Sequence, residues 1–146
     1  MRYYEDLVTG YVNTRSEPYL VTEDEILEMG RRWDPQPFHT DPEAAASSVF
    51  GGLVASTVHL FAICVKIGMA VSEDTAIVSA LGMTDFVNHA PARPGDVVTF
   101  GWTVADRRES RSRPTLGIVT SSNVLTNQHD DPVFTFTNSW LVERRP

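Results

Sequence analysis

The feature that most constrains this chain is an apolar run from residue 53 to residue 71. The run is long enough to span a bilayer, but polar residues such as Ser56, His59 and Lys66 interrupt it and no second run follows. A membrane span is therefore the less favoured interpretation. A helix that is apolar on nearly every side is typical of the buried centre of a domain. We therefore expect a long helix here, enclosed by the rest of the chain.

The chain after residue 76 has the alternating pattern of β-strands. The clearest signal lies in residues 97–104, where large apolar residues recur with a period of two: Val98, Phe100, Trp102 and Val104. Similar strands are expected at 76–89, 116–125 and 133–142, with a charged connection at 107–114. Such strands must bury the apolar helix against one face of their sheet. The sequence therefore predicts an α+β domain in which a curved antiparallel β-sheet wraps around a long central helix.

Composition limits the classes of protein to which the chain can belong. With 146 residues, we expect a single domain over residues 1–146. The formal net charge of −7 argues against nonspecific binding to nucleic acid or to a membrane surface. The one cysteine, Cys64, lies in the apolar run and can form no disulfide within the chain. Acidic residues near Met1 do not fit a secretory signal, so a cytoplasmic location is expected.

Two titratable residues flank a short loop before the apolar run. Thr22 and Glu25 have the spacing of a capping box, which predicts a helix from about residue 23 to residue 32. Asp34 follows this helix, and a loop with two prolines separates it from His39. An extended loop, rising about 3.1 Å per residue, would hold the two side chains apart. Spacing alone leaves two alternatives: a curled loop with both residues in one site, or a helix stop followed by a surface histidine, which the local pattern favours.

This loop resembles the hydratase signature of the MaoC-like family of acyl dehydratases, relatives of the (R)-specific enoyl-CoA hydratases. That signature runs Asp-x-Asn-Pro-aliphatic-His, then Asp-Pro, and later a glycine-containing turn into a long helix. The matching residues here are Asp34-Pro35-Gln36-Pro37-Phe38-His39-Thr40-Asp41-Pro42, and then Phe50-Gly51-Gly52-Leu53-Val54-Ala55-Ser56. Two positions depart from the pattern, because Gln36 stands in place of Asn and Thr57 in place of the Gly of many members. The resemblance covers nearly the whole chain and implies the hotdog fold.

The resemblance also implies a set of site residues. Asp34 and His39 would be the catalytic pair that holds a water molecule, with Asp34 as the base and His39 as the proton donor or orienting group. The family's oxyanion donor is a backbone N–H near the start of the central helix, which is Thr57 here, and Gly52 could share that task. For His59, two interpretations stay open: a hydrogen-bonded core residue, which is the more common case, or a residue of the substrate pocket.

The activity implied is the reversible hydration of a 2-enoyl-CoA to an (R)-3-hydroxyacyl-CoA, with coenzyme A as part of the substrate and no other cofactor. Two alternatives remain: a hotdog thioesterase, and a noncatalytic acyl-CoA-binding subunit, for which Thr57 is the best support. The four histidines and one cysteine have no spacing that suggests a metal site. Because hotdog domains commonly pair their sheets edge to edge, a homodimer or a dimer of dimers is expected.

Overall fold

The apolar run forms the central helix α4 (Thr57–Ala70) of a computed structural model that describes residues 1–13 and 15–146. The helix begins four residues later than the run, because Ser56 is its N-cap and accepts a hydrogen bond from the His59 amide. The segment just before it is extended, since the amides of Val54 and Ala55 donate to carbonyls of other segments. Within the described residues, no helix has both the length and the apolar character needed to cross a membrane.

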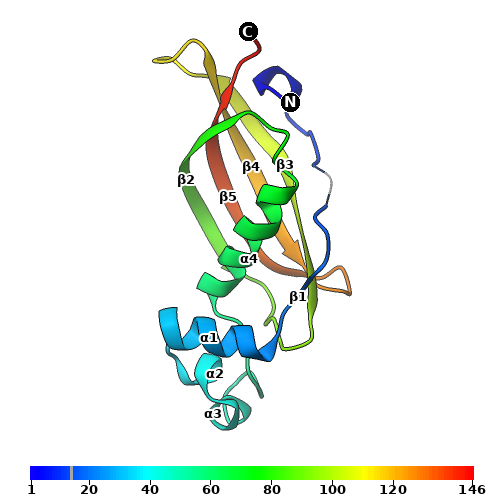
Figure 1. The fold of residues 1–146 in the computed structure, drawn as a ribbon, viewed down its shortest axis with the longest axis vertical. Coiled ribbons are helices and arrows are strands. Elements are labelled where there is room, and N and C mark those ends of the chain that lie inside the picture. The colour runs from blue at the N-terminus through cyan, green and yellow to red at the C-terminus, as the bar shows by residue number, and fades with distance from the viewer. Residues whose placement is uncertain (14) are drawn as a thin grey trace.

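A five-stranded antiparallel sheet curves around α4 (Figure 1). Its strands lie in the order β1-β3-β4-β5-β2, with the bounds β1 (Tyr19–Leu20), β2 (Ile77–Asn88), β3 (Val97–Glu109), β4 (Leu116–Thr126) and β5 (Pro132–Glu143). Leu60, Ile63 and Ile67 of α4 belong to the same buried cluster as the inward residues of the sheet. A curved sheet around one long helix is the hotdog fold, so the predicted fold class is confirmed.

Two details of the expected elements are wrong. The central helix is not enclosed on nearly every side, because the sheet covers only one side of it and Val58, Val65 and Met69 are about half exposed. The charged connection is shorter than expected, because β3 continues to Glu109. Arg107 can lie in this strand because its guanidinium donates to the Tyr4 carbonyl at 3.0 Å and stacks on the Tyr4 ring.

Strand β2 has one partner, β5, and a β-bulge near its end. Asp85 has a φ of 58° at a register shift between Thr84 and Val87. Next to it, the Phe86 ring stacks on that of Phe136, with ring centroids 5.6 Å apart. The opposite edge of β2 has no partner strand in the described chain, and apolar side chains of β2 remain exposed.

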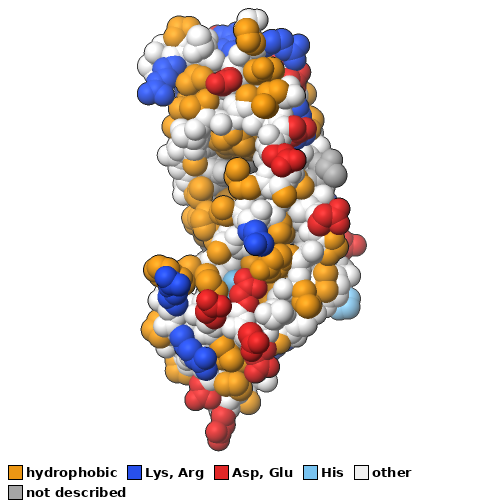
Figure 2. Space-filling model, viewed as in Figure 1, with side chains coloured by type: hydrophobic (Ala, Val, Ile, Leu, Met, Phe, Trp, Pro, Cys, Tyr) orange, Lys and Arg blue, Asp and Glu red, His pale blue; other side chains and the backbone are white. Residues whose placement is uncertain are grey.

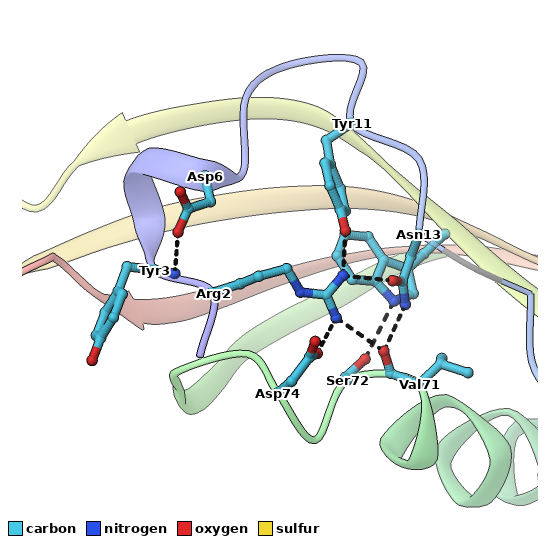
Figure 3. Close-up of polar contacts among 9 residues, drawn as sticks. Arg2, Tyr3, Asp6, Tyr11, Asn13, Val71, Ser72 and Asp74 are labelled. Carbon is cyan, nitrogen blue, oxygen red and sulfur yellow. Dashed lines mark hydrogen bonds and ion pairs between the residues drawn. The ribbon is translucent and has the colours of Figure 1, made fainter.

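The amino-terminal segment runs beside β3 and is tied to the end of α4. The irregular strands expected over residues 3–21 reduce to β1 and a single bridge at Val12, and Thr14 lies outside the described residues. Figure 3 shows the Arg2 guanidinium pointing at the Asp74 carboxylate and at the Val71 carbonyl, which ends α4. A cation at a helix carboxyl end is favourable, so this contact helps to fix α4 in place.

Three helices cover the end of the sheet at which α4 begins (Figure 1). They are α1 (Glu23–Trp33), α2 (Pro37–Thr40) and α3 (Pro42–Ala46), while the 3₁₀ turn η1 (Tyr4–Asp6) lies at the other end. Thr22 caps α1 as predicted, by accepting from the Glu25 amide. The Glu25 carboxylate does not complete a capping box, because it contacts Tyr19 and His59 instead.

Candidate active site

The loop after α1 curls and brings Asp34 and His39 together. Asp34 ends α1 with its N–H bonded to the Gly30 carbonyl at 3.0 Å, and the short helix α2 then turns the chain back. His39 Nε2 lies 3.5 Å from Asp34 Oδ2, and the imidazole is buried whereas a quarter of the Asp34 side chain is exposed. The alternative of a surface histidine is therefore wrong, because α2 points the ring inward.

The orientation of the His39 ring is fixed by a backbone carbonyl. Its Nδ1 lies 2.6 Å from the carbonyl oxygen of Val54. A carbonyl can only accept, so Nδ1 carries the proton and Nε2 faces the Asp34 carboxylate. The second carboxylate oxygen of Asp34 accepts from the Gln36 amide at 3.0 Å. Gln36, the mild departure from the family signature, thus orients Asp34 through its side chain.

Gly30 is required for this geometry and was missed by sequence reasoning. A Cβ placed on Gly30 would lie 2.4 Å from the His39 carbonyl oxygen, well inside contact distance. The helix and the loop can approach this closely only because no side chain stands between them. A glycine inside a helix costs about 1 kcal/mol relative to alanine, and that cost was the available signal that the position has a packing role.

The pair lines a pocket of about 350 Å³ at the start of α4. Apolar residues from several segments contribute to its wall, among them Phe38, Phe50 and Leu60. Figure 2 shows a hollow between the α1–α3 end of the molecule and the nearby end of β2. The pocket therefore combines an acid–base pair with an apolar wall, an arrangement common in small-molecule sites.

Thr57 also lines this pocket, at the first position of α4. Its hydroxyl accepts a hydrogen bond from Asn88 Nδ2 at 2.8 Å. Its backbone N–H has no acceptor among the described residues, as is usual in the first turn of a helix. The partial positive charge of the helix end adds to this donor, so the amide can stabilise an anion in the pocket. Asn88, at the end of β2, carried no sequence signal.

The structure does not bring Gly52 or His59 to the pocket surface. Gly52 lies in the turn after α3, next to the Arg93 guanidinium that donates to the Phe50 carbonyl at 2.6 Å. His59 is fully buried, with Nε2 3.3 Å from Glu25 Oε1. Burial lowers the pKa of His59, and the Glu25 carboxylate partly opposes that shift. Contact of either residue with substrate stays a prediction.

Behind Glu25 lies a third titratable side chain, that of Tyr19. Its hydroxyl is 2.8 Å from each carboxylate oxygen of Glu25. Burial, the hydrogen bond and the negative charge of Glu25 together raise the pKa of Tyr19 to about 12. Tyr19 therefore donates to Glu25 as a neutral phenol. In the described part of the chain, no group of three His, Cys, Asp or Glu residues has the arrangement of a metal site.

A second cavity, of about 250 Å³, lies farther along α4, between this helix and the sheet. Its lining is mostly apolar and includes Phe61, Cys64, Met83 and Trp140. Burial raises the pKa of the Cys64 thiol to about 12, so this residue is a core thiol rather than a nucleophile. Trp33, exposed at the end of α1, lines neither cavity.

Comparison with known proteins gives concordant matches over most of the chain. The family model for the MaoC like domain matches residues 9–127. A structure of a MaoC-like dehydratase from Rhodospirillum rubrum is 35% identical, with a TM-score of 0.92 over 100% of this chain and 99% of that one. R-hydratase PhaJ1 from Pseudomonas aeruginosa shares the fold, with 18% identity and a TM-score of 0.72 over 98% of this chain and 86% of that one. The uncharacterized protein YdeM of Bacillus subtilis is 29% identical over 85% of this chain and 87% of its own length.

Proposed function

The chain belongs to the MaoC-like dehydratase family, and from this membership we propose that it reversibly hydrates a 2-enoyl-CoA to an (R)-3-hydroxyacyl-CoA. Coenzyme A would enter as part of the substrate, and no further cofactor would be needed. The observation that carries the proposal is the Asp34–His39 pair, 3.5 Å apart on the wall of a pocket that also contains a free helix-start amide.

In this proposal a water molecule sits between Asp34 Oδ2 and His39 Nε2. Asp34 accepts a proton from the water while the water oxygen bonds to Cβ of the substrate. The electron pair of the double bond then moves toward the thioester oxygen. The ring of His39, carrying a second proton on Nε2, then delivers that proton to Cα. Passage of the first proton from Asp34 to His39 restores the pair. Dehydration is the same sequence reversed.

The negative charge on the thioester oxygen needs a donor, and the start of α4 supplies one. The Thr57 N–H faces the pocket end of the helix without an acceptor among the described residues. One donor of this kind typically contributes about 10²- to 10³-fold to the rate. Because the main chain is the donor, the threonine side chain does not remove the function. The threonine hydroxyl accepts a hydrogen bond from Asn88, which lines the same pocket.

A second copy of the chain is the proposed partner along the free edge of β2. Val78, Leu81 and Phe86 of this strand are about half exposed, as are Val58 and Met69 of α4. Figure 2 shows hydrophobic side chains on the face above these two elements. An exposed apolar edge of this length is normally covered. Light scattering of the purified protein should therefore give at least twice the mass of one chain.

The enzymatic proposal is tested by the loss of absorbance of the conjugated thioester when the protein is mixed with crotonyl-CoA and longer 2-enoyl-CoAs. Asp34→Asn and His39→Ala should each lower the rate by about 10²- to 10⁴-fold. Asp24→Asn and His129→Ala change exposed residues of the same types and should keep wild-type rates.

Three results would contradict the proposal. Unchanged absorbance with every thioester, together with saturable acyl-CoA binding that Asp34→Asn leaves intact, would identify a noncatalytic binding subunit. Release of free thiol from acyl-CoA would identify a thioesterase. Wild-type rates in Asp34→Asn would place the chemistry elsewhere.

A further inference from the structure

Two of the carboxylates of helix α1 and its C-cap each face a buried histidine from a different helix. Asp34, at its end, faces His39 of α2, whereas Glu25, in its first turn, faces His59 of α4 at 3.3 Å. The first pair opens onto the pocket. The second pair has no role in the mechanism described above, although the imidazole of His59 is removed from water, with the partly exposed Glu25 carboxylate beside it. Such a cost suggests a function for the pair.

His59 cannot act on substrate from where it lies. Both of its ring nitrogens are closed to solvent and form no hydrogen bond with the described residues, and Nε2 makes only a 3.3 Å contact with Glu25 Oε1. His59 is also not part of the pocket wall. An ionised carboxylate only accepts, so the nearness of Glu25 to Nε2 favours the tautomer that carries the proton on this nitrogen. Glu25 is in turn held by the Tyr19 hydroxyl, which bonds both of its oxygens. Tyr19, Glu25 and His59 thus follow one another across β1, α1 and α4, with hydrogen bonds between the first two and a 3.3 Å contact between the last two.

His59 lies in the same first turn of α4 as the Thr57 amide, the candidate oxyanion donor. Its own amide donates to the Ser56 side chain, and this bond defines the first turn of α4, in which Thr57 lies. Glu25, for its part, belongs to the helix that Asp34 caps. A contact between Glu25 and His59 therefore fixes the element that supplies the base relative to the element that supplies the anion-binding amide.

We propose that Glu25 and His59 are positioning residues whose buried contact locks α1 onto the start of α4, holding the Asp34–His39 pair in register with the Thr57 amide. This inference rests on the proposed function for its catalytic consequence, but the geometry that it describes can be measured without turnover. Groups that face His59 are Glu25 from α1 and His39 from α2, with Tyr19 behind Glu25. A second proton on the His59 ring would add a buried positive charge beside His39. That charge would weaken the alignment of the Asp34–His39 pair with the Thr57 amide.

The kinetic test compares two replacements of His59. His59→Leu fills the space but removes the donor, and it should lower kcat about 10- to 100-fold, since a displacement near 1 Å can cost about 10²-fold. KM should change by less than about threefold, because substrate contacts remain. His59→Gln restores an N–H at the reach of Nε2 and should return kcat to within about threefold of wild type. Glu28→Gln, an exposed carboxylate of the same helix, is the matched control.

A double variant tests whether the two residues act as a pair. Glu25→Leu and Glu25→Leu/His59→Leu should lose about as much kcat as His59→Leu alone, because each change removes the same contact. Additive losses would overturn the pairing. Wild-type kcat in folded His59→Leu, or equal losses in His59→Leu and His59→Gln, would overturn the positioning role.

Histidine ¹⁵N NMR of the protein without substrate separates this inference from the proposed function. The wild-type spectrum should show His59 protonated on Nε2 and His39 protonated on at least Nδ1. The His39 signals should shift in His59→Leu and stay in place in Glu28→Gln and His59→Gln. If the wild type hydrates no thioester but these shifts occur, the proposed function fails and the positioning contact stands. Unchanged His39 signals in His59→Leu would overturn the inference, whatever the activity.

Discussion

Replacing Gly30 by alanine should lower the activity of the protein about 10²-fold while leaving it folded. The new Cβ would lie 2.4 Å from the His39 carbonyl oxygen and 2.9 Å from both the carbonyl carbon and Cβ of His39. Because ordinary contacts of this kind begin near 3.4 Å, the backbone of His39 must move by about 1 Å. That movement would change the distance from His39 Nε2 to the Asp34 carboxylate and strain the bond from Nδ1 to the Val54 carbonyl.

The expected magnitudes differ for stability and for activity. Alanine gains about 1 kcal/mol over glycine inside a helix, whereas overpacking costs about 1–3 kcal/mol. The net loss in free energy of unfolding should therefore be about 0–2 kcal/mol, which lowers Tm by at most about 8 °C for a domain of this size. A displacement of about 1 Å at a catalytic side chain should lower kcat by about 10²-fold.

Thermal unfolding followed by circular dichroism and the enoyl-CoA absorbance assay measure the two effects separately. Gly82→Ala is the matched control, because no atom lies within 4 Å of a Cβ placed there, and it should keep the wild-type rate. If Gly30→Ala retained kcat within about threefold of wild type, the close approach of α1 would not be what sets the position of His39. A variant that failed to fold would show that the packing cost had been underestimated.

Three further outcomes are expected. Thr57→Pro deletes the candidate oxyanion N–H at the N1 position, where proline suits a helix, and should lower kcat about 10²-fold or more. Thr57→Ala keeps the N–H and should keep most of the wild-type kcat. Equal kcat values in the two variants would place the anion-binding donor elsewhere. Cys64, with its pKa raised to about 12, should resist iodoacetamide at pH 8 until the protein is unfolded; rapid labelling of folded protein would contradict its burial. The lowered pKa of His59 means that the unfolded chain binds its proton more readily. Stability should therefore fall as the pH drops below about 6.5, and the slope should be shallower in His59→Gln; identical slopes would assign the acid sensitivity to other groups.

The sequence predicted those elements whose signals are local. Thr22 caps α1 through the Glu25 amide, and the period of two from Val98 to Val104 marks a real strand, because caps and alternating burial depend on near neighbours. The exposed side of α4 could not be predicted in this way. An apolar residue such as Met69 has the same local signature whether it faces a sheet or the outside of the molecule.

The candidate site shows the same difference between local signals, which the sequence contains, and tertiary contacts, which it does not. Asp34 and His39 were identified by resemblance to a family signature, whereas their spacing favoured a surface histidine. The local pattern was misleading because it contains nothing about Val54, whose carbonyl holds the imidazole ring. Asn88 is held to Thr57 from a strand far along the chain and carried no signal at all.

Glu25 shows why one residue can satisfy a local rule and still serve a different purpose. A glutamate three residues after a capping threonine is favourable at a helix start whatever the rest of the fold does. Here its amide makes the predicted contact with Thr22, while its carboxylate points inward to Tyr19 and His59. Glu25 in the first turn of α1 therefore has two roles, one in starting the helix and one in contacting Tyr19 and His59. Only the tertiary structure distinguishes the second role from the first. If the buried contact sets the register of the site, substitutions at Glu25 should affect catalysis more than helix stability, in contrast to those at the exposed Glu23.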